Sequence, residues 1–282
     1  MASAYNHSTA LQMAHLSSAA YCDSSVIKNW SCGPDCSAVS VAGPVLVSYL
    51  SDLNLQAYTV AMPNNEAAVV FRGTVASSIK DWILNLNVSK VQNYEKCSAC
   101  GVEGGFLHGW RSLEPSILSN LKTLGFGPGS TLHVTGHSLG AAMATLAALE
   151  LKGKGYRVAT QYTFGQPRVG NAAFANLFQS TLGAAGQFRV THYHDPVPHV
   201  PLVKMDFYHT TTEVWYNEAN TQYTVCTGGE SPTCADSTPW YDFWAVEDHL
   251  HYMGITIDGA TCSLGGRKQY AADQGVIRLA PE

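Results

Sequence analysis

The residues with the clearest chemical potential form the stretch Gly136-His137-Ser138-Leu139-Gly140. An apolar run, residues 131–135, precedes it, and a run rich in alanine and leucine, residues 141–151, follows it. This order predicts a tight strand-to-helix turn that exposes the Ser138 hydroxyl as a nucleophile. The free N–H groups of the helix start would then face any oxyanion formed there. The alternative is a glycine-rich turn that carries an idle serine.

A serine nucleophile requires a base and an acid that orients the base, and after a turn of this kind the acid precedes the histidine in the chain. Asp195 is the preferred acid because it follows an apolar strand, 188–191, and because two prolines stiffen its loop. The rival carboxylates lack that setting, and they are Asp206, Asp236, Asp242 and Asp248. For the base, the residues alone leave both His249 and His251 open.

A metal site is the alternative interpretation of the histidines near this acid. His192, His194 and His199 could hold an ion on spacing alone. The neighbouring prolines oppose regular ligand geometry, so we expect no metal and no other cofactor.

The cysteines indicate an oxidising compartment. By spacing they form three close pairs and one remaining distant pair: Cys32 with Cys36, Cys97 with Cys100, Cys226 with Cys234, and Cys22 with Cys262. An even number in such pairs favours four disulfides and secretion. Half of a zinc site at 97–100 is the alternative, but no second motif of that kind completes it.

Composition narrows the class of partner. The chain has 282 residues, 46% of them hydrophobic, and a net charge of −5, which argues against nucleic acid. No run of 18 apolar residues occurs, so at most a peripheral contact with lipid is expected. Glycosylation sequons at Asn6, Asn29 and Asn87 fit secretion. The polar start predicts a mature form with an added methionine.

Strand and helix patterns alternate along the chain. The expected strands are 45–50, 56–62, 67–72, 131–135, 161–164 and 188–191, and the expected helices are 9–21, 113–124, 141–151 and 174–182. This alternation predicts a single α/β domain, residues 1–263, with a mostly parallel central sheet. Residues 264–282 have little apolar periodicity and are expected to form a flexible tail.

A further amphipathic helix is expected at about 77–87. Its apolar face carries Ile79, Trp82, Ile83 and Leu86. Periodicity alone does not decide whether this face packs permanently in the core or closes over the site as a lid.

Several segments together resemble one family. They are 71–74, 79–86, 136–140, 164–171, 189–201 and 248–254. In this order they are similar to the class 3 triacylglycerol lipases of filamentous fungi, a family related to feruloyl esterases. The resemblance implies an α/β-hydrolase fold with a helical lid and disulfides. It also implies a triad of Ser138, Asp195 and His249, because the family pattern His-Leu-x-Tyr-x-Gly begins at His249.

The remaining site residues follow from chemistry and from the resemblance. The expected oxyanion donors are the backbone N–H of Leu139 and the backbone N–H or hydroxyl of Thr74. Thr74 follows the strand that ends near Arg72. The resemblance implies that the 77–87 helix is a lid and that Val197, Val200 and Leu250 line an acyl groove. One departure stands out, because Glu103 occupies a position where the family usually has a histidine.

The sequence therefore predicts a secreted, monomeric triacylglycerol lipase that acts at an oil–water interface. Feruloyl esterase and phospholipase A1 activity are alternatives on the same scaffold, and the Cys226–Cys234 pair is more similar to the feruloyl esterase branch. The apolar Trp82 and Ile83 argue against the feruloyl esterase. A non-catalytic lipid-binding protein is the alternative from another class, but all three triad residues are present.

Overall fold

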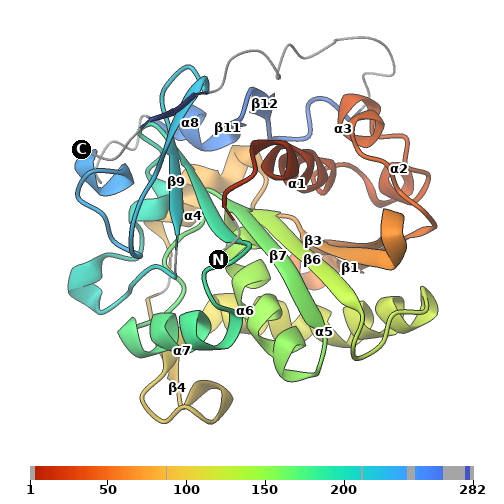
Figure 1. Cartoon of the computed structure of the whole chain (residues 1–282), viewed down its shortest axis with the longest axis horizontal. Coiled ribbons are helices and arrows are strands. Elements are labelled where there is room, and N and C mark those ends of the chain that lie inside the picture. Colours follow the sequence, from red (N-terminus) through yellow and green to blue (C-terminus); the bar gives the residue numbers. More distant parts are fainter. Residues whose placement is uncertain (1–3, 87, 211, 240–244, 263–276, 280–282) are drawn as a thin grey trace.

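A nine-stranded sheet forms the centre of the computed structural model, which describes residues 4–86, 88–210, 212–239, 245–262 and 277–279 (Figure 1). The strands in spatial order are β1 (Val45–Leu50), β2 (Leu55–Met62), β3 (Glu66–Phe71), β6 (Thr131–His137), β7 (Arg157–Phe164), β8 (Gln187–His192), β9 (Glu213–Tyr216), β10 (Gln222–Val225) and β13 (Ile277–Leu279).

The middle of this sheet is parallel, as the sequence predicts. Strands β3, β6, β7, β8 and β9 pair in parallel. Strands β1 and β2 add antiparallel pairs at one edge, and β10 does so at the other. Strand β13 pairs in parallel with β10 and belongs to the segment 264–282, for which we expected a flexible tail. The other residues of that segment lie outside the described part of the chain.

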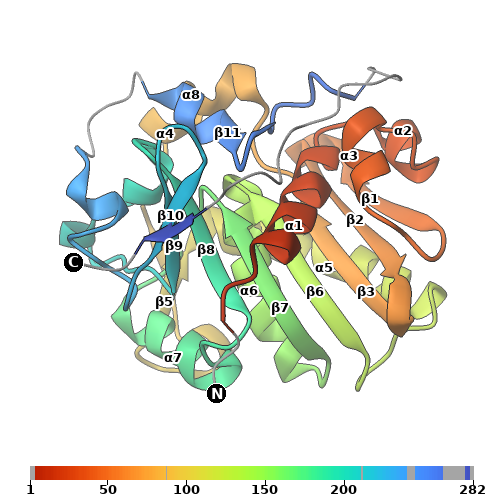
Figure 2. The same ribbon diagram turned by 45° about the horizontal axis from the view of Figure 1, so that its top comes forward.

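Helices cover both faces of the sheet. On one face lie α5 (Gly104–Thr123), α6 (Leu139–Gly153) and α7 (Ala172–Leu182), and on the other lies α1 (His7–Ala19) (Figures 1 and 2). Alternate residues of β3 enter the two resulting cores, Val69 and Phe71 on the side of α5 and α6, Ala68 and Val70 on the side of α1. This explains the continuous apolar pattern of the strand, because both of its faces are buried.

Helix α5 begins nine residues earlier than the expected helix 113–124. Glu103 caps it, since its carboxylate accepts hydrogen bonds from the N–H groups of Gly105 (3.0 Å) and Phe106 (2.6 Å). A carboxylate at a helix start satisfies N–H groups that have no partner within the helix. The glycines at 104 and 105 have low helix propensity, so the sequence pattern does not indicate a helix there. The cap that allows the helix to begin is the carboxylate of Glu103.

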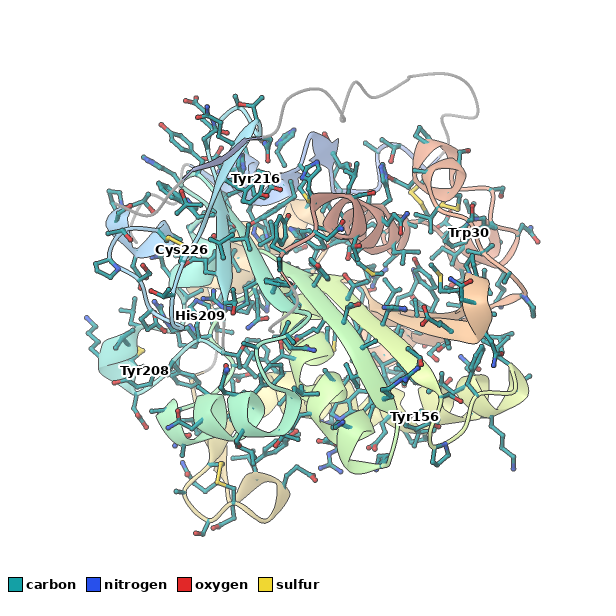
Figure 3. The ribbon with its side chains drawn as sticks, viewed as in Figure 1. Trp30, Tyr156, Tyr208, His209, Tyr216 and Cys226 are labelled. Atoms are coloured by element: carbon teal, nitrogen blue, oxygen red, sulfur yellow. A yellow bond between two sulfur atoms is a disulfide. The ribbon has the colours of Figure 1, made fainter. Side chains whose placement is uncertain are left out.

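Short elements and disulfides complete the fold. The short elements are α2 (Ser24–Lys28), α3 (Gly33–Ala38), α4 (Ile79–Leu84), β4 (Lys90–Gln92), β5 (Gly101–Glu103), α8 (Val246–Leu250), β11 (His251–Tyr252) and β12 (Ile255–Thr256). The four predicted disulfides are present, including the Cys22–Cys262 bridge across 240 residues and the bridge of Cys226, which follows β10 (Figure 3). Within the described residues, no helix is both long enough and apolar enough to cross a membrane.

Candidate active site

Ser138 occupies the turn between β6 and α6. Its backbone has φ 60° and ψ −131°, a conformation that costs free energy in any residue other than glycine and that is found at functional turns. Gly140 allows α6 to begin close to the end of β3, because a Cβ at this position would lie 2.8 Å from the carbonyl carbon of Arg72. The start of α6 therefore packs directly against the end of β3, and the Ser138 side chain is fully buried.

Asp195 and His249 meet beside this turn. Asp195 follows β8, and His249 lies in α8. The two carboxylate oxygens of Asp195 lie 3.0 and 2.9 Å from Nδ1 of His249. Gly165, after β7, leaves space for the pair, since a Cβ there would lie 2.8 Å from Nδ1 of His249. His251 instead directs its Nδ1 to the carbonyl oxygen of Glu247, 2.7 Å away, so the structure distinguishes the two candidate bases.

Two buried polar atoms of the site have no hydrogen-bond partner among the described residues. They are Oγ of Ser138 and Nε2 of His249. Burying a polar atom without a partner costs free energy, so such atoms in a native structure indicate a functional role. Asp195 holds the far side of the His249 ring, so Nε2 is the nitrogen that remains available as a base.

Three donors act on the Asp195 carboxylate. Besides His249, the backbone N–H of Val197 donates at 2.8 Å to Oδ1, and the Tyr252 hydroxyl donates to Oδ2. Burial raises the pKa of Asp195, but the facing His249 and these donors outweigh burial and hold that pKa below its usual value. Tyr252 was not expected from the sequence in this role, although it is the tyrosine of the His-Leu-x-Tyr pattern.

The expected oxyanion donors lie on the two segments that meet at Ser138. Leu139 is the first residue of α6, and Thr74 follows the end of β3 by three residues. At Gly73 a Cβ would lie 2.8 Å from Cβ of Ser138, so the loop backbone is in direct contact with the turn. Leu139 and Thr74 are both half-buried.

The apolar face of helix α4 packs against the segments that carry Asp195 and His249. Ile79 and Ile83 are buried against Val197 and Val246, which lie two residues after Asp195 and three residues before His249. Figure 2 shows α4 beside α8 at the same end of the sheet. The outer face of α4 is different, since Leu84 is 70% exposed. The helix therefore has one face packed against the segments that carry Asp195 and His249 and one exposed face.

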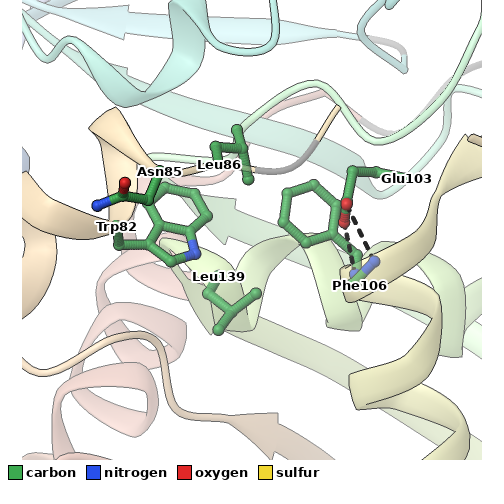
Figure 4. Close-up of a pocket in the computed structure, with 7 residues that line it drawn as sticks. Trp82, Asn85, Leu86, Glu103, Phe106 and Leu139 are labelled. Atoms are coloured by element: carbon green, nitrogen blue, oxygen red, sulfur yellow. Dashed lines mark hydrogen bonds between the residues drawn. The ribbon is translucent and has the colours of Figure 1, made fainter. Parts of the chain in front are cut away.

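A cavity of about 240 Å³ lies between α4 and the start of α5 (Figure 4). Its lining is largely apolar and comprises Trp82, Asn85, Leu86, Glu103, Gly105, Phe106 and Leu139. The rings of Trp82 and Phe106 stack with centroids 6.2 Å apart. Burial raises the pKa of Glu103, although its carboxylate accepts two backbone N–H groups.

Two of the three residues expected in an acyl groove lie near Ile83 of α4. Val197 packs beneath α4. Val200 lines a second cavity together with Ile83 and Leu86. Leu250, at the end of α8, is not among the residues that line either of these two cavities, and its place in an acyl groove stays a prediction.

Two of the three histidines considered for a metal point to different partners. His192 directs Nδ1 to the carbonyl oxygen of Asp248, and His199 directs Nε2 to the Thr238 hydroxyl. Within the described residues, the one cluster of possible ligands is Glu213 with Cys226 and Cys234. These two sulfurs are bonded to each other and are not available as thiolates. Of the rival acids, Asp206 pairs with Lys90 and Asp236 with Arg168, while Asp242 lies outside the described residues.

Comparison with known sequences gives consistent relatives. The family model for lipase (class 3) matches residues 68–205. The secreted mono- and diacylglycerol lipase 1 of Fusarium solani is 34% identical over 262 residues, which cover 87% of this chain and 74% of that protein. The secreted mono- and diacylglycerol lipase A of Penicillium cyclopium is 37% identical over 191 residues, which cover 66% of this chain. That match spans only 61% of the length of the Penicillium protein.

Solved structures agree with this result. The triacylglyceride lipase of Rhizomucor miehei has a TM-score of 0.72 and 29% identity, covering 90% of this chain and 96% of its own. Lipase II from Rhizopus niveus has a TM-score of 0.74 and 27% identity, covering 89% and 96%. A triacylglycerol lipase whose catalytic centre is described as a serine protease triad is 32% identical with a TM-score of 0.72, covering 90% and 96%. This chain therefore belongs to the class 3 lipase family and has the α/β-hydrolase fold.

Proposed function

We propose that the protein is a secreted serine ester hydrolase that cleaves triacylglycerols at an oil–water interface. The observation that carries the proposal is the arrangement of Asp195, His249 and Ser138. Asp195 orients His249, and the only buried polar atoms of the three without a partner among the described residues are Nε2 of His249 and Oγ of Ser138. Membership of the class 3 lipase family supports the same chemistry.

The reaction follows from these positions. Nε2 of His249 accepts the proton of the Ser138 hydroxyl while Oγ attacks the ester carbonyl carbon. Asp195 remains ionised and stabilises the imidazolium. The oxyanion accepts hydrogen bonds from the N–H of Leu139 and from Thr74. The intermediate then expels the alcohol, which takes the proton from His249. Water releases the fatty acid by the same sequence of steps and restores Ser138.

Helix α4 would make this reaction dependent on an interface. In the closed arrangement Ile79, Trp82 and Ile83 face inward, and Ser138 is fully buried. A lipid surface binds the exposed apolar face of an open helix and so shifts the equilibrium towards the open state. The protein would act as a monomer with peripheral contact to lipid. Extracellular location is supported by the disulfides and by relatives named as secreted.

A second candidate substrate class is mono- and diacylglycerol. The names of the Fusarium solani and Penicillium relatives favour it. The chemistry is the same, and only the alcohol side of the substrate differs.

The test is a substrate panel measured across the solubility limit. Tributyrin, triolein, diolein and monoolein are compared, with methyl ferulate as a fifth substrate and Ser138→Ala as the control variant. A rate that rises sharply when triolein or tributyrin forms a separate phase, and that is absent in the variant, supports the proposal. Activity confined to diolein and monoolein would favour the second candidate. Activity on methyl ferulate alone would overturn both.

A further inference from the structure

A hydrogen-bonded chain lies beneath the site and uses residues that the proposed reaction does not. Tyr21 follows α1, and its hydroxyl oxygen lies 2.7 Å from Nδ1 of His137. The same hydroxyl lies directly against the backbone of Gly73, because a Cβ added at that glycine would collide with it. On the other side of the His137 ring, Nε2 lies 2.7 Å from the carbonyl oxygen of His249. The hydrogen-bonded chain therefore runs from Tyr21, whose hydroxyl contacts the residue before Thr74, to the backbone of His249.

Chemistry assigns the direction of every bond in this chain. The carbonyl oxygen of His249 can only accept, so Nε2 of His137 carries a proton and donates it. Burial and the neighbouring His249 lower the pKa of His137 to about 3, so its ring is neutral at ordinary pH. A neutral imidazole has one N–H, so Nδ1 is an acceptor. The Tyr21 hydroxyl must therefore donate to it, and burial, by raising the pKa of Tyr21, keeps that proton in place.

The members of this chain are covalent neighbours of the expected catalytic groups. Gly73 precedes Thr74, and His137 precedes Ser138. The ring of His137 also packs against that of His249, with centroids 4.4 Å apart. The fit is tight, because a Cβ at Gly73 would lie 2.5 Å from the carbonyl oxygen of His137. A shift in any one of the three segments would therefore disturb the other two.

We propose that Tyr21 and His137 are positioning residues that hold the oxyanion loop, the nucleophile turn and the base in one register. This inference rests on the proposed function. The hydrogen bonds of Tyr21 and His137 fix the relative positions of Thr74, Ser138 and His249 before substrate binds. Such preorganisation stabilises the transition state more than it strengthens substrate binding. Its loss should therefore lower kcat and leave KM nearly unchanged.

The test compares two tyrosine-to-phenylalanine variants. Tyr21→Phe removes the central hydroxyl of the chain. Tyr58→Phe is the matched control, since Tyr58 is fully buried in the same core as Tyr21 and donates to the carbonyl oxygen of Leu16 at 2.7 Å. We expect kcat of Tyr21→Phe on emulsified tributyrin to fall about tenfold, equivalent to one buried hydrogen bond, with KM within about twofold. The Tyr58→Phe variant should keep kcat even if its melting temperature falls equally.

Two further measurements do not depend on the stability of Tyr21→Phe. Nitrogen-15 NMR of the wild-type protein should show His137 protonated at Nε2 alone. In a second variant pair, His137→Gln keeps an N–H that can reach the His249 carbonyl, and His137→Leu keeps none. We expect kcat to decrease in the order wild type, His137→Gln, His137→Leu.

The positioning role would be overturned by any of three results. These are an unchanged kcat in Tyr21→Phe, an equal fall in Tyr58→Phe, or a wild-type His137 protonated at Nδ1. Ser138→Ala separates this outcome from failure of the proposed function. If Ser138→Ala is inactive while Tyr21→Phe is fully active, only the positioning role fails. If Ser138→Ala remains active, the proposed function itself fails.

Discussion

The Tyr252 hydroxyl donates to Oδ2 of Asp195, the oxygen that also lies 2.9 Å from Nδ1 of His249. One carboxylate oxygen therefore accepts hydrogen bonds from two donors. The side chains of both donors, Tyr252 and His249, are fully buried. We predict that Tyr252→Phe lowers kcat about tenfold, because Asp195 then loses a bond that fixes its orientation. Steady-state kinetics on a soluble short-chain ester would measure this. An unchanged kcat would show that His249 and Val197 suffice to hold the carboxylate.

The same variant should change the response to acid. The pKa of Asp195 is below its usual value in the folded protein, so the ionised carboxylate contributes stability above the unfolded pKa of about 3.9 and loses it as pH falls through the folded value. Tyr252→Phe removes one of the donors that lower this pKa. Acid unfolding should therefore begin at a higher pH in the variant. Denaturant titrations from pH 5 to pH 2 would test the shift, and coincident curves would contradict it.

Thr74 offers a test of the oxyanion site. We predict that Thr74→Ala lowers kcat, by up to about 100-fold if the hydroxyl donates to the oxyanion, with a modest change in KM. Thr74→Ser is the control, because it keeps a hydroxyl and should keep most of the activity. If Thr74→Ala retains the wild-type kcat, the side chain has no part in stabilising the oxyanion.

Two neighbouring residues of α4 allow a test of the proposed lid, because one is buried and the other is exposed. Ile83 is 6% exposed and packs on Val197 and Val246, whereas Leu84 is 70% exposed. Ile83→Ala should destabilise the closed state by about 2 kcal/mol or more, so activity on dissolved substrate should rise and the jump at the interface should shrink. Leu84→Ala should leave the activity on dissolved substrate unchanged. Equal behaviour of the two variants would argue against a lid.

The disulfides should differ in their effect on stability according to loop length. The Cys22–Cys262 bridge closes 240 residues, and the Cys97–Cys100 bridge closes three. In the chain-entropy model, loss of the first costs about 5 kcal/mol and loss of the second about 2 kcal/mol. Paired serine substitutions in each bridge, followed by chemical denaturation, would measure the two free energies of unfolding. A larger loss from the short bridge would contradict this ranking.

Local patterns in the sequence predicted those parts of the fold that depend on a few consecutive residues. The buried strand at β3 and the turn at Ser138 were recognisable because hydrophobic periodicity and glycine spacing act over a few residues. The start of α5 was not recognised, since two glycines follow the cap at Glu103 and weaken the helical pattern. The mostly parallel sheet followed from the alternation of elements.

Only the tertiary structure decided which distant groups meet. The sequence by itself determined the nucleophile turn, the cysteine pairs and the apolar face of α4. It left His249 and His251 equivalent until a family resemblance was considered, and it gave no indication that Tyr21 and His137 join the base to the oxyanion loop. The physical reason is that hydrogen bonds between residues more than 100 positions apart leave no periodicity in the chain. They arise when β3, β6 and α8 pack at the same end of one sheet.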